Sequence, residues 1–365
     1  MKKWLPFILL ALLLAACTPS ADTPASTSQT ENSDDTPTNG RSAADLTAIK
    51  EYLLTKAETL HSSSLALQTA ANDYYQLAEA ADFDYAALWQ QNAEATAASL
   101  LTAKEAWIAA SPGYEQIEGI VAGVPTLAEY DVILDAGAAG DGEDAAPYDL
   151  TLADGRILQR PGNLFGVLES ALWGTVPDYT TTVAADLDGS GAVDFGEGLP
   201  DALVLKAAAD ALVSYVADMQ QASQAWQPSE SDAFTALVVM IPTMNEYFES
   251  WKNSRFVAGD ASTQSDFVVI SRLADIQDIL SSLQVVHTGI SPLIVEVDAA
   301  QDEQIAAGLS NLKTFVADVY QQELAGKQFT AEEADLLGSE AQDQATALAG
   351  QVAQVAAQLN VPIQE

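Results

Sequence analysis

Apolar residues recur at intervals of three and four positions along most of this chain, and that spacing is typical of amphipathic helices. The first such stretch runs from Leu46 to Ala78. Its length exceeds that of most lone surface helices, so we expect it to lie in a helical bundle. The same spacing predicts further helices over 83–110, 163–173, 202–227, 232–251, 267–287, 299–324 and 331–359. The chain is therefore predicted to be all-α.

Proline and glycine mark the places where these helices should end. Ser111-Pro-Gly113 is expected to end the second helix, and Pro242 is expected to kink or break the helix that contains it. Between the helices, residues 148–158 alternate between polar and apolar around the turn Asp154-Gly155. That pattern predicts one minor β-hairpin in a helical protein.

The first residues of the chain have the features of a bacterial lipoprotein signal. A lysine pair precedes an uncharged apolar run, which ends in Leu14-Ala-Ala-Cys17. This order predicts a signal peptide over residues 1–16, and its ending resembles a lipobox. The single cysteine is therefore expected to carry a lipid anchor. Residues 17–42, rich in Ser, Thr, Pro and Asp, are predicted to be a disordered tether. We expect the mature protein to be extracytoplasmic and lipid-anchored to a membrane of the cell envelope.

Acidic residues greatly outnumber basic ones. The chain has 52 Asp and Glu against 14 Lys and Arg, a formal net charge of −38. This excess argues against binding of nucleic acid and against electrostatic docking on anionic lipid, so the predicted membrane contact is the lipid anchor alone. The charge is compatible with binding of cations, although a solubilising surface would have the same composition.

Segment 186–197 matches the calcium loop of an EF-hand. Its carboxylates, hydroxyl, tight-turn glycine and carbonyl fall at the loop positions that supply oxygen ligands to Ca²⁺. The residues before it are rich in β-branched side chains, and Gly198-Leu-Pro200 follows it, so we do not expect the flanking helices of a paired EF-hand. We predict one solitary calcium loop; an acidic turn without an ion is the alternative. The ligands would be Asp186, Asp188, Ser190, Ala192 through its carbonyl, Asp194 and Glu197.

Several charged residues fall within apolar helical runs. Glu169 is one, and a carboxylate there is costly without a partner unless it faces solvent or caps a neighbour. Arg272, Asp275 and Asp278 recur at intervals of three in another apolar run. A bundle core could pair them with Glu169 or Glu118, whereas a solvated stripe on an amphipathic helix is the alternative.

Two acidic pairs precede these helices. Glu115 and Glu118 are three residues apart on an expected helical turn and would share a face, and Asp131 and Asp135 are four apart. Each pair taken alone is more often part of a solvated face than of a ligand set.

Five stretches together resemble the imelysin family, the iron-regulated and insulin-cleaving-protease-like bacterial surface proteins, and the imelysin-type domain of ferrous iron uptake systems. These stretches are 83–89, 111–125, 169–174, 255–259 and 271–280. The resemblance covers most of residues 45–360 and implies two four-helix bundles that meet around a metal-binding motif. We therefore expect a first bundle over 43–175, the calcium-loop segment over 176–200 and a second bundle over 201–365.

The hallmark of the family is G-x-H-x-x-E, whose His and Glu are proposed metal ligands. When the Glu is aligned on Glu169, Gly166 stands in the place of the His and Leu164 in the place of the Gly. Only Glu169 carries over, and a glycine has no side chain with which to coordinate a metal. Neither of the two histidines, His61 and His287, restores the motif from sequence. The chain also lacks H-E-x-x-H, so we do not expect a metallopeptidase.

Two functional hypotheses follow. The first is an imelysin-like envelope protein that binds a metal ion or small ligand between the bundles and serves iron acquisition with iron-uptake partner proteins. Carboxylates without imidazole suit hard ions such as Fe³⁺, Ca²⁺ or Mn²⁺ better than Zn²⁺. The second is a non-catalytic, calcium-stabilised interaction module whose imelysin-type site has degenerated. The residues expected to line that site are Glu169, Glu115, Glu118, Arg272, Asp275 and Asp278.

Overall fold

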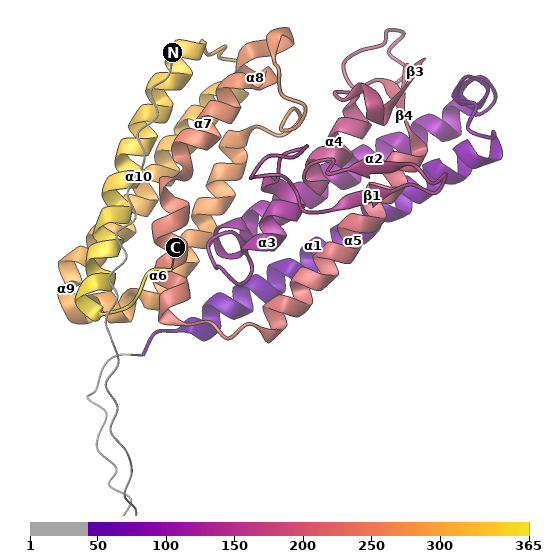
Figure 1. Cartoon of the computed structure of the whole chain (residues 1–365). Helices are drawn as coiled ribbons and strands as arrows, with labels where there is room; N and C mark the ends of the chain where they lie inside the picture. The colour runs from indigo at the N-terminus through magenta and orange to yellow at the C-terminus, as the bar shows by residue number, and fades with distance from the viewer. Residues whose placement is uncertain (1–42, 365) are drawn as a thin grey trace, which may run out of the picture. The chain divides into compact units, whose positions relative to one another are not determined.

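The structure is a computed structural model that describes residues 43–364 (Figure 1). The predicted signal peptide over 1–16, the lipidated Cys17 and the tether over 17–42 lie outside the described residues. Within the described range, long helices make up most of the chain and the strands form two short pairs, so the all-α prediction is confirmed.

Three long helices pack together in the first part of the chain. They are α1 (Leu46–Ala80), α2 (Tyr85–Val121) and α5 (Ala202–Ala225). α1 contacts both of the others through a stripe of buried residues, from Ile49 to Tyr74, that repeats at three and four positions. Asp45 caps α1 by accepting a hydrogen bond from the backbone N–H of Ala48. The predicted first helix is thus confirmed.

α2 does not end before Pro112, as we had predicted. The helix continues through the proline to Val121. A proline inside a helix removes one hydrogen bond and costs about 3 kcal/mol. Here the following turns bury Tyr114, Ile117 and Ile120 completely, and this packing outweighs the local penalty. As a result, Glu115 and Glu118 are carried on a continuous helix into the interior.

Short elements connect α2 to α5. They are α3 (Ala128–Asp131), the π-helix η1 (Val132–Ala136), β1 (Asp149–Thr151), β2 (Ile157–Gln159), α4 (Leu164–Trp173), η2 (Pro177–Tyr179), β3 (Thr180–Ala184) and β4 (Gly198–Pro200). β1 and β2 pair antiparallel, as the predicted hairpin requires. α4 is buried along its whole length, with Asn163 as its N-cap and Gly174 at its C-terminal end.

A second group of helices is built from the rest of the chain. They are α6 (Glu230–Met240), η3 (Ile241–Thr243), α7 (Met244–Asn253), α8 (Arg255–Ala258), η4 (Gly259–Ala261), α9 (Arg272–Leu324) and α10 (Ala331–Leu359). α10 packs on α6, α7 and α9, and α9 also contacts α2. Pro242 lies where α6 gives way to α7, which agrees with the predicted break.

α9 begins later than predicted. We expected a helix from Phe267, but the helix starts at Arg272 with Ser271 as its N-cap. Residues 267–269 instead donate their backbone N–H groups to a carboxylate of α4, and Phe267 has a φ of 53°, which a right-handed helix does not allow. At Asp298 the backbone leaves the helical region, near the predicted start of the 299–324 helix.

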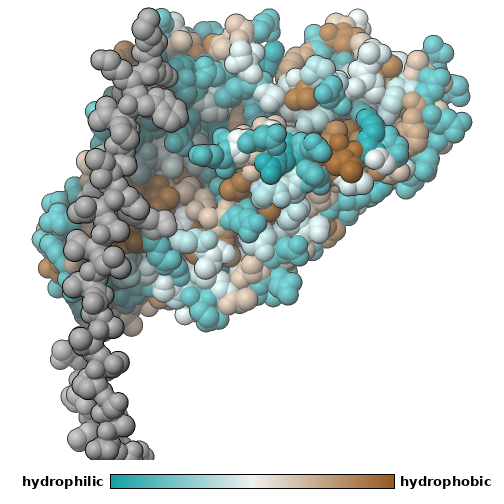
Figure 2. All heavy atoms as spheres, in the orientation of Figure 1, coloured by the Kyte–Doolittle hydropathy of each residue, from teal (hydrophilic) through white to brown (hydrophobic). Residues whose placement is uncertain are grey.

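α5 packs mainly on α1 and also on α4, although we assigned residues from 201 onward to the second bundle. α5 thus packs on helices that we assigned to the first bundle. The predicted domain boundaries at 175 and 200 stay a prediction. The face shown in Figure 2 is covered mostly by hydrophilic and intermediate residues, with hydrophobic ones scattered among them.

Candidate functional site

Arg272 is a buried cation surrounded by carboxylates. Arg272 is the first residue of α9, and its buried side chain lies among acidic residues of α2 and η1. Its Nη1 atom lies 3.1 Å from Asp275 Oδ2, 3.6 Å from Glu115 Oε1 and 3.7 Å from Asp135 Oδ2. These three carboxylates are at most 3% exposed. Arg272 is thus paired inside the core, but its partners are Asp275, Glu115 and Asp135 and not the Glu169 or Glu118 that the sequence suggested.

Aromatic rings complete the surroundings of Arg272. The ring of Phe267 lies 3.6 Å from the guanidinium carbon and that of Tyr247 4.9 Å from it. Cations are attracted to the faces of aromatic rings, and the attraction strengthens when water is excluded. The Tyr247 hydroxyl also donates a hydrogen bond of 2.6 Å to Glu118, so the same ring fixes the orientation of that carboxylate.

Carboxylates outnumber cations in this cluster, and burial disfavours their charged forms. Burial raises the pKa of Asp131 and of Asp275 to about 7, while Arg272 opposes the shift in both. Burial also raises the pKa values of Glu115 and Asp135 well above their usual range, with Arg272 again opposing. The cluster therefore holds protons near neutral pH when no other cation is bound.

A cavity of about 500 Å³ opens beside the cluster. Its wall comes from α2, the α3–η1 segment, the α6–α7 region and the segment before α9. The carboxylates on this wall are Glu118, Asp131, Asp135, Glu246 and Asp266, and the guanidinium is that of Arg272. A cavity with this lining favours a cationic ligand, because a cation reduces repulsion between the acidic groups.

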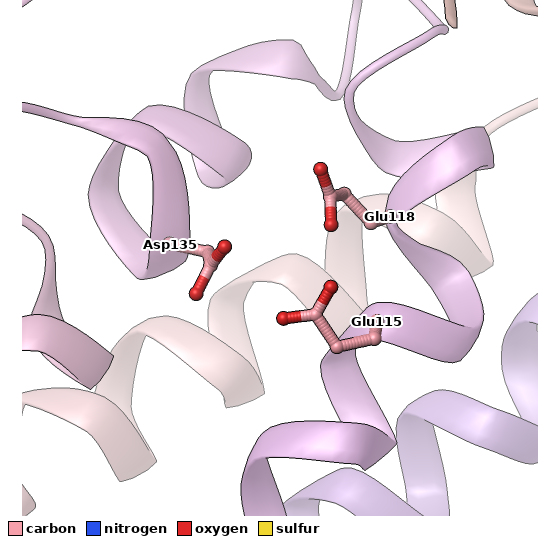
Figure 3. Close-up of side chains that lie close together, drawn as sticks. All are labelled: Glu115, Glu118 and Asp135. Carbon is pink, nitrogen blue, oxygen red and sulfur yellow. The ribbon is translucent and has the colours of Figure 1, made fainter. Parts of the chain in front are cut away.

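Sequence reasoning had favoured solvated faces for both acidic pairs, and that interpretation is wrong for their buried members. Glu115, Glu118 and Asp135 have carboxylate oxygens within 4.8 Å of one another (Figure 3). Asp135 lies in the π-helix, an element that is frequent at functional sites but has no sequence pattern of its own. Tyr247 carried no signal at all.

Comparison with known proteins agrees with this fold. The model of the imelysin family (Peptidase_M75) matches residues 48–360. The chain belongs to the imelysin family. Among solved structures it is similar to a protein described as an iron-regulated protein A precursor, from Parabacteroides distasonis ATCC 8503. The TM-score is 0.50 and the identity 15%, over 88% of this chain and 97% of that one. The chain has no match among curated proteins.

Glu169, which we aligned with the Glu of the imelysin motif, accepts hydrogen bonds from the backbone. Its Oε2 atom accepts a hydrogen bond of 2.6 Å from the N–H of Phe267, and its Oε1 atom accepts bonds of 2.9 and 3.0 Å from Val268 and Val269. Burial raises the pKa of Glu169 to about 8, and these N–H groups oppose that rise. Glu169 does not line the cavity. In this imelysin it positions the segment that carries Phe267 onto Arg272.

The space in which the motif histidine would begin is occupied in this chain. A Cβ atom placed on Gly166 would lie 2.9 Å from Asn163 Oδ1 and 3.0 Å from Asp266 Oδ2. Both distances are shorter than ordinary van der Waals contact. The Asn163 oxygen is fixed there because it caps α4 by accepting from the Gly166 N–H. A side chain at 166 would therefore require Asn163 and Asp266 to shift.

Asp278, predicted as a sixth site residue, lies apart from the cavity. It is half-buried, and burial raises its pKa above the usual value, although Gln116, Lys313 and Lys56 oppose the rise. His287 is buried with its Nε2 atom 3.1 Å from Asp302 Oδ1, and burial lowers its pKa. Neither residue lines the acidic cavity.

The predicted calcium loop connects β3 to β4, so strands flank it rather than helices. Carboxylate oxygens of Asp186, Asp188 and Glu197 lie within 4.8 Å of one another. Glu197 accepts hydrogen bonds from the backbone N–H groups of Leu187, Asp188 and Asp194. The loop therefore gathers three of its predicted ligands around its own backbone.

Proposed function

We propose that this imelysin is a lipid-anchored, extracytoplasmic protein that binds a metal ion or a small cationic ligand in the acidic cavity and serves iron acquisition. The observation that carries the proposal is the imbalance of charge on the cavity wall, where five carboxylates face one guanidinium. Such a wall is unfavourable when empty and ionised, and a bound cation removes the repulsion.

Iron is the metal that the comparisons favour. The similar structure from Parabacteroides distasonis is described as iron-regulated, and the stretches of sequence that resemble imelysins also resemble the imelysin-type domain of ferrous iron uptake systems. The chemistry of the wall supports the same choice, since carboxylate oxygens are hard ligands that suit Fe³⁺, Fe²⁺ or Mn²⁺. We infer that iron-uptake proteins of the envelope are the partners that supply or receive the ion.

Isothermal titration of the purified chain tests this proposal, with ferrous iron under anaerobic conditions and ferric citrate in air. We expect saturable binding that weakens at least tenfold when Asp266→Asn and Glu246→Gln remove two cavity carboxylates. Glu105→Gln, an exposed site on α2, is the matched control and should bind as the unmodified chain does. Absence of any iron binding by the unmodified chain would overturn the proposal.

We propose a binding role rather than peptidase activity, although the family is named for a peptidase. A zinc peptidase needs imidazole ligands and a free Glu as base. In this chain Gly166 replaces the motif histidine, and both oxygens of Glu169 accept backbone hydrogen bonds. Cleavage of an unfolded protein substrate that a chelator stops would contradict this role.

A second candidate function is a calcium-stabilised interaction module. The gathering of Asp186, Asp188 and Glu197 in the 186–197 loop favours it. If the loop binds Ca²⁺, the ion should raise the melting temperature by mass action on the folded state, and Asp186→Ala should abolish that rise. An unchanged melting temperature at millimolar Ca²⁺ would exclude this function.

A further inference from the structure

We propose that Glu115, Glu118 and Asp135 form a discrete site for one hard, multivalent cation at the inner end of the acidic cavity. This inference rests on the proposed function, because it names the ligand set and the class of ion. It assigns the ion to α2 and η1 rather than to the helix that carries Glu169. Figure 3 shows the three carboxyl groups pointing toward one another.

The first support is an oxygen on each residue that has no hydrogen bond, although Asp135 Oδ2 lies 3.7 Å from Arg272 Nη1. Glu115 Oε2, Glu118 Oε2 and Asp135 Oδ2 are buried without a hydrogen bond, although all three residues are at most 3% exposed. Buried polar atoms in native proteins nearly always have a partner, and each missing partner costs about 1–3 kcal/mol. Three such atoms in one place indicate that the site lacks a ligand.

The second support is the spacing of the donors. Each of the three residues offers one carboxylate oxygen, and these oxygens lie within 4.8 Å of one another. Two oxygens on opposite sides of a cation such as Mg²⁺ or Ca²⁺ are about 4–5 Å apart, because each lies about 2.0–2.6 Å from the ion. One ion can therefore contact all three carboxylates with small side-chain movements.

The neighbouring groups determine which charge the site accepts. Arg272 Nη1 lies 3.6 Å from Glu115 and 3.7 Å from Asp135, so the guanidinium neutralises one charge of the cluster. Together with Asp275, the trio would carry four negative charges when ionised. A monovalent ion leaves most of the remaining repulsion, whereas a divalent or trivalent ion removes it. The absence of nitrogen and sulfur donors among the three ligands disfavours Zn²⁺ and Cu⁺ relative to harder ions.

An ion can reach the trio from the cavity. Glu118, Asp135 and Arg272 lie on the cavity wall, whereas Glu115 lies behind them and does not line it. Tyr247 holds the other oxygen of Glu118 through its 2.6 Å hydrogen bond, which leaves Oε2 available. A hydrated ion entering the cavity would thus meet Glu118 and Asp135 first and reach Glu115 as it loses water.

The test is equilibrium dialysis of the full mature chain against Mn²⁺, Fe²⁺, Ca²⁺ and Zn²⁺, with metal content measured by elemental analysis. All variants carry Glu197→Gln so that the calcium loop does not contribute. We expect one Mn²⁺ or Fe²⁺ to bind per chain. Glu115→Gln and Asp135→Asn should each weaken this ion at least a hundredfold, and Glu105→Gln should not change it.

Melting temperature provides a second readout that a damaged fold would not mimic. Glu115→Gln keeps the shape of the side chain, so the variant should still unfold cooperatively, but Mn²⁺ should not raise its melting temperature as it raises that of the parent. If Glu115→Gln and Asp135→Asn bind as the parent does while Asp266→Asn weakens binding, the trio is overturned and the cavity function stands. If the parent binds no cation, both are overturned.

Discussion

The Glu169 carboxylate accepts a hydrogen bond from the backbone N–H of Phe267, with 2.6 Å between Oε2 and the peptide nitrogen. Phe267 in turn covers the guanidinium of Arg272 at 3.6 Å. The acidic residue of the degenerate motif is therefore linked to the charged cluster through one aromatic ring. Glu169 therefore acts on the cluster by positioning Phe267, and not by contact with a ligand.

Glu169→Gln should therefore destabilise the protein and loosen the segment before α9. The amide places an NH₂ group where one carboxyl oxygen accepts, and each buried N–H left without an acceptor costs about 1–3 kcal/mol. We expect a loss of about 2–4 kcal/mol in urea denaturation and faster amide exchange at residues 267–269. Glu94→Gln, exposed on α2, is the control. Unchanged exchange at 267–269 would show that the carboxylate is not the anchor.

Arg272→Met should be among the most damaging single substitutions. It leaves Glu115, Asp135 and Asp275 without a cation, and removal of one partner of a buried ion pair costs about 3–5 kcal/mol. Adding Asp275→Asn should recover part of the loss, because it removes one of the repelling charges. Denaturation of the two single variants and the double variant measures this coupling. A double variant less stable than Arg272→Met alone would contradict the pairing.

The stability of the metal-free protein should fall as pH rises from about 4 to 7. Asp131 and Asp275 have folded-state pKa values of about 7, above the value of ~3.9 for Asp in an unfolded chain. The folded state therefore binds more protons than the unfolded state in that window, and the free energy of unfolding decreases until it levels off above it.

Denaturation in the presence of a chelator at several pH values measures this slope, and Asp275→Asn should make it shallower. Cation affinity should change in the opposite direction and increase with pH, because protons compete with the ion for the same carboxylates. A metal-free stability that rises between pH 4 and 7 would be incompatible with protonated carboxyl groups in the cluster.

Restoring the motif histidine should not by itself restore a metal site. Gly166→His places a Cβ atom within 3.0 Å of Asn163 and Asp266, and overpacking of this kind costs about 1–3 kcal/mol. Gly166→His combined with Asp266→Ala should recover part of that stability. Thermal denaturation of both variants measures the loss and recovery of stability, and Zn²⁺ titration measures whether a metal site has formed. A single variant that is fully stable would show that the space is open.

The helices could be predicted because their apolar spacing decides which face is buried. α10 has the predicted bounds, and α1 differs from its prediction only at the last residues. The errors occurred where packing between distant segments overrides a local signal. Pro112 did not end α2 because the residues after it are buried, and residues 267–269 did not become helical because they bind Glu169 with Phe267 at a φ of 53°.

The candidate site was only partly accessible from sequence for the same reason. Arg272 and Asp275 could be singled out as charges in an apolar run, and Glu115 and Glu118 as a pair that shares a helical face; both are local properties. Asp135 belongs to the cluster because it is a buried residue of the π-helix, and Tyr247 because its hydroxyl donates to Glu118 across 129 positions of sequence. Both depend on tertiary contacts that no spacing along the chain encodes.

The backbone of Phe267 adopts φ of 53°, in the left-handed region that favours glycine. The ring of the same residue is needed to cover Arg272, and glycine would not provide it. The backbone conformation at 267 thus favours glycine, whereas the contact with Arg272 requires an aromatic ring. Few residue types meet both requirements, so we expect few substitutions to be tolerated at this position.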